Sequence, residues 1–137
     1  MIGLDSERRV LITYQYNNAP QRVVDEFPGG GVEADEPCVD AARRELLEET
    51  GFYAQRLHEI GSFLINNRRS AGRMRIFVAT DLEQRTVTTQ EEELVACEWV
   101  PVDEVERRIR AGELENSTLL AAWSIFRAKL LEDAAAE

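Results

Sequence analysis

The feature that most constrains the fold is one helical segment, predicted over residues 37–50, with strand-like segments on both sides of it. Val39, Ala42 and Leu46 recur at the three- and four-residue spacing that places side chains on one face of a helix. Gly51 follows the segment directly, and glycine commonly ends a helix. The pattern therefore predicts one central helix whose apolar face packs against the core.

The start of this helix has signals of its own. Pro37 suits the first helical turn, and Asp35 or Glu36 is the expected capping residue. Asp40 lies near the positive end of the helix dipole, where negative charge is favourable. These features place the first turn close to residue 37.

Segments rich in β-branched and aromatic residues predict the strands. The predicted strands are residues 1–4, 10–16, 52–65 (as one strand or two), 74–82 and 94–101. Residues 17–26 are predicted to form a polar loop. The two closing segments, 102–112 and 116–135, are predicted helices. This order favours one domain over residues 1–137, with a mixed α/β layer arrangement rather than a regular βαβ series.

The overall charge limits the class of partner. The formal net charge is -10, which argues against a nucleic acid polymer or an anionic membrane, because both attract Lys and Arg. Small phosphorylated ligands stay compatible, because a bound metal can reverse the sign of a local site. The sequence has no signal peptide and no run of about 18 apolar residues, so we expect a cytoplasmic protein.

The cysteines and the histidine give no functional signal. Cys38 and Cys97 fit no zinc or CxxC pattern, and we expect both to be small reduced side chains. His58 is the single histidine, which argues against a histidine-based metal site or catalytic dyad. We expect His58 to be an ordinary surface or strand residue.

Three glutamates crowd one turn of the predicted helix. Glu45, Glu48 and Glu49 occupy positions i, i+3 and i+4, which share one helix face. Like charges at this spacing cost roughly a few tenths of a kcal/mol per pair. Hard cations such as Mg²⁺ prefer oxygen ligands, so a bound cation would turn the repulsion into attraction. Taken alone, the pattern also fits a solvent-exposed helix face on which the glutamates form ion pairs with Arg43 and Arg44.

A glycine run lies upstream of these glutamates. Pro28 is followed by three glycines, which mark backbone in unusual geometry or closely approached by another group. Gly30 is followed by five residues, Glu36, seven residues and then RELLEETGF. This spacing resembles the Nudix box, the signature of the Nudix hydrolase family, at every defined position over residues 30–52. The resemblance implies an α/β/α sandwich with a central mixed β-sheet, and metal-dependent hydrolysis of a nucleoside diphosphate linked to another group.

The resemblance also implies roles for the residues of the box. The implied ligands of Mg²⁺ or Mn²⁺ are Glu45, Glu48, Glu49 and the carbonyl of Gly29. Glu45 and Glu48 are in addition candidates for a catalytic role. Arg44 would brace the glutamates through charge-assisted contacts. Glu36 would tie the loop around Gly30 to the helix rather than perform chemistry.

A second acidic cluster, Glu91 to Glu93, precedes the last predicted strand. In the Nudix family, a glutamate from a loop distant in sequence often completes the metal site or acts as the general base. Glu92 or Glu93 is the candidate for this role. A charged loop tip explains any one of the three glutamates equally well.

Four residues are predicted to contact the substrate. Arg73 and Arg75 lie at alternate positions at the start of a predicted strand, so they share a face. Arg68 lies in the loop before that strand. These arginines could bind phosphate or the other half of a nucleotide, and Tyr16 could stack on a base. Surface arginines and a core tyrosine are the ordinary alternative.

Outside the box, the chain is similar to ADP-ribose pyrophosphatases and nucleotide-sugar hydrolases. Their Gln-Tyr-Arg motif is kept as Gln15 and Tyr16, with Asn17 in place of the arginine. Gly29 replaces an alanine of that group, which is closer to nucleoside-triphosphate enzymes. The favoured substrate is therefore ADP-ribose or a nucleotide sugar, which would give a nucleoside monophosphate and a phosphorylated product.

Two other functions stay open on the sequence. One is a housecleaning nucleoside-triphosphate pyrophosphohydrolase, and the other is a non-catalytic Nudix module that binds a nucleotide or ADP-ribose. The closing helices are similar to those of the ADP-ribose and nucleotide-sugar group, in which dimers are common. The apolar terminal helix therefore fits either a homodimer contact or an ordinary core role.

Overall fold

The computed structural model of this chain describes residues 1–87 and 94–136. Its strands are β1 (Ile2–Gly3), β2 (Arg9–Asn17), β3 (Arg22–Glu26), β4 (Phe52–Leu64), β5 (Arg73–Gln84) and β6 (Leu94–Pro101). Its helices are α1 (Cys38–Thr50), α2 (Val102–Arg110) and α3 (Ser117–Ala136). All three helices that the sequence predicts are therefore present, close to their predicted bounds.

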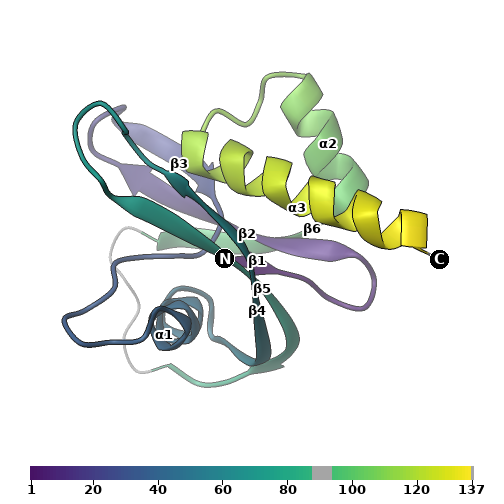
Figure 1. The fold of residues 1–137 in the computed structure, drawn as a ribbon, viewed down its shortest axis with the longest axis horizontal. Helices are drawn as coiled ribbons and strands as arrows, with labels where there is room; N and C mark the ends of the chain where they lie inside the picture. Colours follow the sequence, from purple (N-terminus) through teal and green to yellow (C-terminus); the bar gives the residue numbers. More distant parts are fainter. Residues whose placement is uncertain (88–93, 137) are drawn as a thin grey trace.

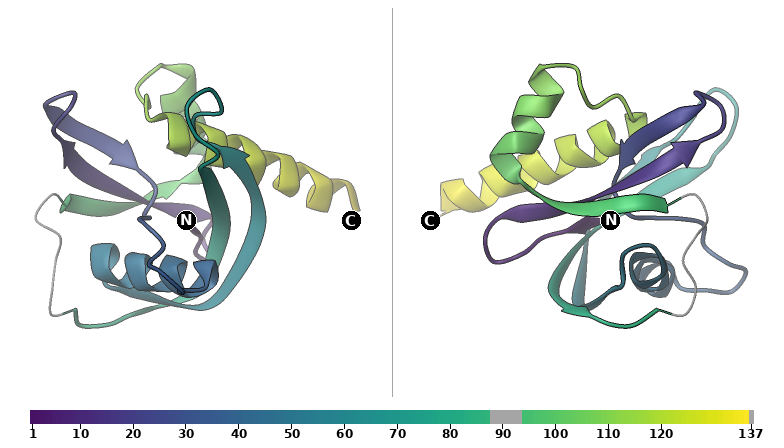
Figure 2. Two further views of the ribbon diagram at one scale, coloured as in Figure 1. Left: turned by 60° about the vertical axis from the view of Figure 1, so that its left-hand side comes forward. Right: turned by 180° about the vertical axis from the view of Figure 1, so that it is seen from behind.

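The strands form two three-stranded sheets, ordered β1-β5-β4 and β3-β2-β6. The first sheet is mixed, because β1 runs parallel to β5 whereas β4 runs antiparallel to it. The second sheet is antiparallel throughout. Helix α1 lies on one side of the strands, and α2 and α3 lie on the other (Figures 1 and 2). The predicted α/β/α sandwich with a mixed sheet is confirmed, and its strands are divided between two sheets.

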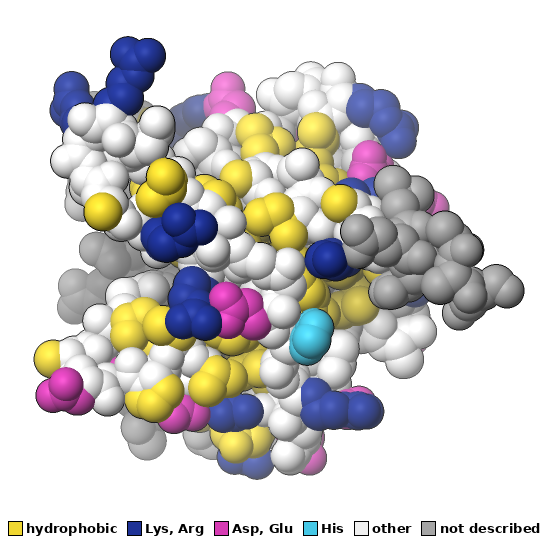
Figure 3. Space-filling view, viewed as in Figure 1, with side chains coloured by type: hydrophobic (Ala, Val, Ile, Leu, Met, Phe, Trp, Pro, Cys, Tyr) yellow, Lys and Arg dark blue, Asp and Glu magenta, His cyan; other side chains and the backbone are white. Residues whose placement is uncertain are grey.

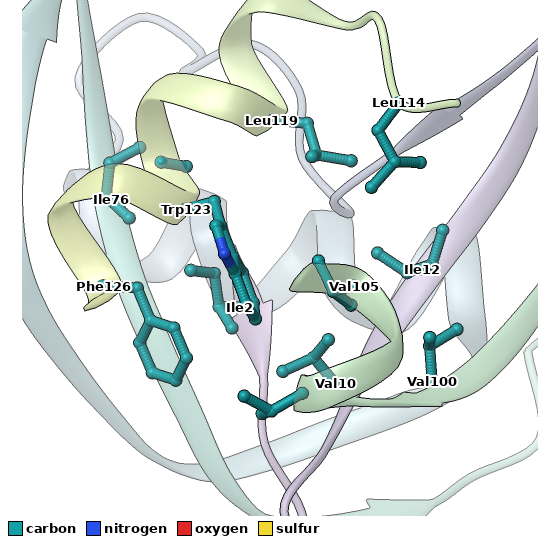
Figure 4. Close-up of a cluster of buried hydrophobic side chains, with 12 residues drawn as sticks. Ile2, Val10, Ile12, Ile76, Val100, Val105, Leu114, Leu119, Trp123 and Phe126 are labelled. Carbon is teal, nitrogen blue, oxygen red and sulfur yellow. The ribbon is translucent and has the colours of Figure 1, made fainter. Parts of the chain in front are cut away.

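The larger hydrophobic core lies between the strands and helices α2 and α3 (Figure 4). It combines Ile12 of β2 and Ile76 of β5 with Val105 of α2 and Trp123 of α3. A smaller cluster near α1 contains Leu11, Leu46, Ala54 and Ala79. Strand β2 contributes to both clusters, because successive side chains of a strand point to opposite faces.

The two ends of α1 differ in how well the sequence predicts them. Gly51 ends the helix as expected and adopts a left-handed conformation with φ 73°. The expected cap by Asp35 or Glu36 is wrong, because the N-cap position is Pro37 and no side chain caps the helix. Asp35 is in a left-handed conformation, and the Glu36 carboxylate is bound to Arg44 instead. Glu36 therefore binds Arg44 and does not cap the helix.

One segment differs from the sequence prediction, and another decides between two predicted alternatives. Residues 22–26, predicted as part of a polar loop, form β3, which pairs with β2 in an antiparallel hairpin. The segment RVVDE is polar at both ends and only partly buried, so its own pattern is weak. Residues 52–64 form one strand rather than two, with an irregularity between Glu59 and Gly61.

The surface carries many ion pairs between side chains of opposite sign. Figure 3 shows basic and acidic side chains interspersed with hydrophobic ones on the face seen in Figure 1. On α2, for example, Arg107 donates to Glu104 at 2.8 Å and to Glu113 at 2.7 Å. No helix within the described residues has both the length and the apolar content needed to cross a membrane.

Glu104 allows this surface network to be tested by pH. Hydrogen bonds from Arg107 and Arg108 lower the pKa of Glu104 from 4.5 to about 2. Because the folded pKa lies below the unfolded value, the stability that Glu104 contributes is present above pH 4.5 and is lost as the pH falls towards 2.

We expect Glu104→Gln to lower the melting temperature slightly at pH 7. The difference from the unaltered protein should shrink as the pH falls below 4.5. Thermal unfolding followed by circular dichroism at several pH values measures this difference. A difference that is constant across the pH series would contradict the prediction.

Candidate functional site

The glutamates of α1 lie beside the glycine loop, residues 28–31. Glu45 and Glu49 are buried, with exposed fractions of 7% and 3%, because their one-turn spacing places both on the inner side of the helix. The Glu48 side chain lies at the margin and is 36% exposed. Burying carboxylates is costly unless other groups bind them, so the partners of these glutamates define the site.

Arg44 binds the loop and two of the glutamates at once. Its guanidinium donates to the two carboxylate oxygens of Glu36 at 3.0 and 3.1 Å, and to the Gly31 carbonyl at 3.1 Å. It also donates to Glu45 at 2.9 Å and to Glu48 at 3.1 Å. The bonds with Glu36 lower the pKa of that carboxyl and raise the pKa of Arg44. These contacts are compatible with the bracing roles predicted for Arg44 and Glu36, which stay predictions.

Gly30 lies directly against the carboxylate of Glu45. A Cβ atom added to Gly30 would overlap all three atoms of that carboxylate group. A Cβ atom added to the neighbouring Gly31 would meet no other atom within 4 Å. The glycine at position 30 is therefore required by the close approach of Glu45, whereas the glycine at 31 is not.

Glu49 is held by donors from two other parts of the chain. The Gly29 N–H donates to Oε2 at 2.9 Å, and the side-chain amide of Gln15 on β2 donates to Oε1 at 2.7 Å. The amino group of Met1 also lies near; burial lowers its pKa to about 6, and the charge of Glu49 opposes that shift. Gly29 contacts Glu49 through its N–H, so the predicted role of its carbonyl as a metal ligand stays a prediction.

Helix α3 reaches the start of the glycine loop. The Phe27 ring stacks on the Trp123 ring of α3, with centroids 6.2 Å apart and an interplanar angle of 24°. Leu119 of α3 lines a small cavity of about 160 Å³ together with Pro28 and Gly29. The loop is thus fixed on one side by α1 and on the other by α3.

A cavity of about 360 Å³ opens beside the glycine loop. Its lining includes Gly30 and Glu45 together with Arg73 and Arg75 of β5, so the structure brings these four predicted residues together. The apolar part of the lining consists of Met1, Val32, Cys38, Ala41, Ala42, Ile65, Met74 and Phe77. A largely apolar cavity with a few charged groups is typical of sites for small organic ligands.

The two arginines of this cavity have protein partners. Arg73 donates to the Ser62 hydroxyl at 2.9 Å. Arg75 donates to Glu59 at 2.9 Å, and this interaction raises the pKa of Arg75. Binding a substrate phosphate through Arg75 would therefore require the arginine to share or exchange Glu59.

The remaining predicted residues lie away from this cavity or outside the described part. Tyr16 is 43% exposed and, being next to Gln15 on a strand, points to the opposite face of β2. Arg68 lies in the exposed connection between β4 and β5. Neither is among the described residues that line the cavity. The acidic cluster with Glu92 and Glu93 lies outside the described residues.

Gln15 is a residue of this site to which the sequence analysis gave no role. The alternation of side chains along β2 could have indicated its position. Leu11 and Thr13 are buried on one face of the strand, and Gln15 follows on the same face. The strand pattern therefore places a polar side chain on the side of the sheet that faces α1. Its contact with Glu49 depends on how the strand and helix pack, which the pattern does not contain.

Arg44→Met tests how much the Arg44 contacts stabilise the fold. The variant keeps the aliphatic stem but leaves the buried Glu45 and the Glu36 carboxylate without their guanidinium partner. We expect the free energy of unfolding to fall by about 2 kcal/mol, as measured by urea denaturation. The exposed Arg110→Met is the control and should differ by less than about 0.5 kcal/mol. Equal effects of both substitutions would contradict the prediction.

The donor set of the site fits a hard divalent cation. Carboxylate oxygens are the ligands that Mg²⁺ and Mn²⁺ prefer, and Glu45, Glu48 and Glu49 supply them from one helix. Among the described residues, no three acidic, histidine or cysteine side chains are already gathered around one point. Binding of a cation would therefore require at least one of these side chains to change conformation.

Comparison with known sequences gives a consistent set of relatives. The sequence profile of the NUDIX domain matches residues 1–122. An ADP-ribose pyrophosphatase of Mycobacterium tuberculosis is 30% identical over 124 residues, which cover 88% of this chain and 60% of that protein. Phosphatase NudJ of Shigella boydii is 38% identical over 90 residues, which cover 65% of this chain and 57% of that protein. The chain thus spans little more than half the length of these curated relatives.

Comparison with solved structures supports the fold. The crystal structure of an ADP compounds hydrolase superposes with a TM-score of 0.85 at 20% identity, covering 96% of this chain and 72% of that one. The NUDIX domain of Shewanella oneidensis NrtR, solved with ADP ribose, gives a TM-score of 0.71 at 18% identity, covering 94% and 84%. At these identities, the likeness establishes a shared fold.

Proposed function

The chain belongs to the NUDIX domain family, and from this premise we propose that it is a metal-dependent hydrolase of the pyrophosphate linkage in a nucleoside diphosphate joined to another group. ADP-ribose or a nucleotide sugar is the favoured substrate, and the products are a nucleoside monophosphate and a phosphorylated remainder. The relatives named ADP-ribose pyrophosphatase support this substrate class.

The observation that carries the proposal is the contact between the glycine loop and the glutamates of α1. Gly30 lies against Glu45, Gly29 donates to Glu49, and Arg44 joins Glu45 to the Gly31 carbonyl. Residues of the box that are separated along the sequence are thus in contact in the structure. A solvated helix face would not bury two of its three glutamates or hold them against backbone.

Glu45, Glu48 and Glu49 are the residues we assign to hold the cation, with the Gly29 carbonyl as a further ligand. When bound, a divalent cation neutralises pyrophosphate charge and makes a bound water more acidic. Arg44 orients Glu45 and Glu48 and balances their charge before the cation binds. Glu92 or Glu93 stays our candidate for the general base that takes the proton of the attacking water.

The cavity beside the glycine loop is the candidate site for part of the substrate. Arg73 and Arg75 lie in its lining and could bind phosphate oxygens, while Met74 and Phe77 offer apolar surface. This placement puts positive charge and apolar surface next to Glu45. We therefore propose a small nucleotide-derived molecule as the partner. We further propose that the protein is cytoplasmic and could act as a homodimer.

One experiment tests the reaction class and the substrate together. The full chain is incubated with Mg²⁺ or Mn²⁺ and a panel of ADP-ribose, nucleotide sugars, dinucleoside polyphosphates and nucleoside triphosphates, and the products are identified. We expect turnover of ADP-ribose or a nucleotide sugar that stops when EDTA removes the metal. Binding of ADP-ribose without turnover of any compound would overturn the enzyme assignment and favour a non-catalytic binding module.

A second candidate is hydrolysis of nucleoside triphosphates. Gly29, which stands where the ADP-ribose group has alanine, favours it. Turnover of nucleoside triphosphates alone in the same panel would establish this alternative and overturn the ADP-ribose preference.

A further inference from the structure

Gln15 lies where β2 reaches the glutamates of α1. Thr13, two residues earlier on the same face of the strand, is completely buried. In the pairing of β2 with β6, the register shifts between Tyr14 and Gln15. Irregularities of this kind change the direction of a side chain and are frequent next to active sites. The strand therefore presents an amide group to α1 at the point where its buried, α1-facing side ends.

The Gln15 amide and the glycine loop hold opposite ends of one carboxylate. Gln15 Nε2 lies 2.7 Å from Glu49 Oε1, and the Gly29 nitrogen lies 2.9 Å from Glu49 Oε2. Both distances are those of well-formed hydrogen bonds to a charged acceptor. Donors on both oxygens restrain the rotation of the carboxylate plane as well as its position.

Gln15 is itself braced from its own hairpin. Asn17 Nδ2 donates to the Gln15 carbonyl at 3.2 Å and to Glu26 Oε1 at 2.8 Å. Glu26 is the last residue of β3, and the glycine loop begins two residues later. The backbone at Gln15 is therefore tied to the segment that also supplies the Gly29 donor. The Gln15 amide and the Gly29 N–H consequently belong to one connected unit.

We propose that Gln15 is a positioning residue that orients the Glu49 carboxylate for binding a divalent cation. This inference rests on the proposed function in one respect, the role of Glu49 as a ligand. Each carboxylate oxygen has two lone pairs, so Oε1 can accept the amide hydrogen and still bind a cation. The amide is neutral, so it orients the carboxylate without cancelling its charge. The guanidinium of Arg44, in contrast, competes with a cation for Glu45 and Glu48.

The first test is Gln15→Met, which keeps an unbranched side chain of similar length and removes the donor. Binding of Mn²⁺ to the metal-free protein is measured by electron paramagnetic resonance of the unbound ion. We expect the Mn²⁺ dissociation constant to rise about tenfold, the usual order of effect for a partner that orients a ligand. The same substitution at the exposed Gln55 of β4 is the control and should leave Mn²⁺ binding unchanged.

Kinetics and melting temperature separate positioning from a loss of fold. At saturating Mn²⁺, kcat of Gln15→Met should fall about tenfold or more while KM changes less than about twofold. The melting temperature without metal shows whether the variant is folded. Gln15→Asn, whose shorter amide cannot reach Glu49, replaces the Met variant if that one does not fold.

A double-mutant cycle tests whether Gln15 acts through Glu49. Adding Gln15→Met to Glu49→Gln should weaken Mn²⁺ binding no further, because the residue that Gln15 orients is already altered. Equal weakening in both backgrounds, or unchanged Mn²⁺ affinity in Gln15→Met, would overturn this inference alone. Failure of the unaltered protein to bind Mn²⁺ would overturn the proposed function and this inference with it.

Discussion

Glu49→Gln is expected to lower metal-dependent turnover by more than about 100-fold. Loss of a residue that only orients a metal ligand typically costs about 10- to 100-fold in affinity or activity, so loss of a ligand should cost more. The substitution removes one negative charge from a carboxylate that is 3% exposed, next to Gly29 and Gln15. Turnover is measured over a range of Mg²⁺ and Mn²⁺ concentrations, because a high metal concentration partly restores the turnover of a variant whose metal binding is weakened.

The same variant should stay folded. Its carbonyl oxygen can still accept the Gly29 N–H, and its new amide can donate to Gln15 if that amide group turns over. We therefore expect the free energy of unfolding to change by less than about 1 kcal/mol in urea denaturation. Glu7→Gln, at a glutamate whose side chain is 70% exposed, is the control for a lost charge. Activity close to that of the unaltered protein in Glu49→Gln would show that our ligand set is wrong.

Gly30→Ala is expected to lower turnover by about 100-fold with a smaller effect on stability. The added methyl group overlaps the Glu45 carboxylate, which is the far end of a flexible side chain and can move. Moving it breaks the contact with Arg44 and takes a proposed ligand out of place. A displacement of about 1 Å in a catalytic group is enough to cost about 100-fold. The lost hydrogen bond should lower the free energy of unfolding by about 1 kcal/mol.

Gly31→Ala provides the matched control for this variant. A Cβ atom at Gly31 meets nothing within 4 Å, and the backbone there does not adopt a positive φ. Its carbonyl group, which accepts from Arg44, is kept in the alanine variant. We expect turnover within about twofold of that of the unaltered protein. If both alanine variants lose activity equally, the loop responds to any added side chain and the specific contact with Glu45 is not the cause.

The sequence predicts those parts of the molecule that depend on local pattern. Helix α1 is correct at its C-terminal end because the apolar spacing and Gly51 are both local signals. The strand β3 was missed because RVVDE gains its structure from pairing with β2. The N-cap was wrong because Glu36 binds Arg44, eight residues further along the chain, instead of the helix N-terminus.

The site shows the same division. The spacing of Gly30, Glu36 and the glutamates of α1 resembles the Nudix box, and that resemblance implied that the loop and the helix meet. The glycine run indicated unusual backbone geometry or the close approach of another group, and the structure identifies the group that approaches Gly30 as the carboxylate of Glu45. The contact of Gln15 with Glu49 joins two elements whose relative placement no local pattern specifies.

The stacking of Phe27 on Trp123 bears on the order in which the contacts of the glycine loop form during synthesis of the chain. A ribosome releases the glycine loop and the glutamates of α1 well before it releases α3. A nascent chain at that stage has every residue of the box but lacks the ring that packs against Phe27. The packing of Phe27 on Trp123 is therefore completed only after α3 has docked, when the whole box is already outside the ribosome.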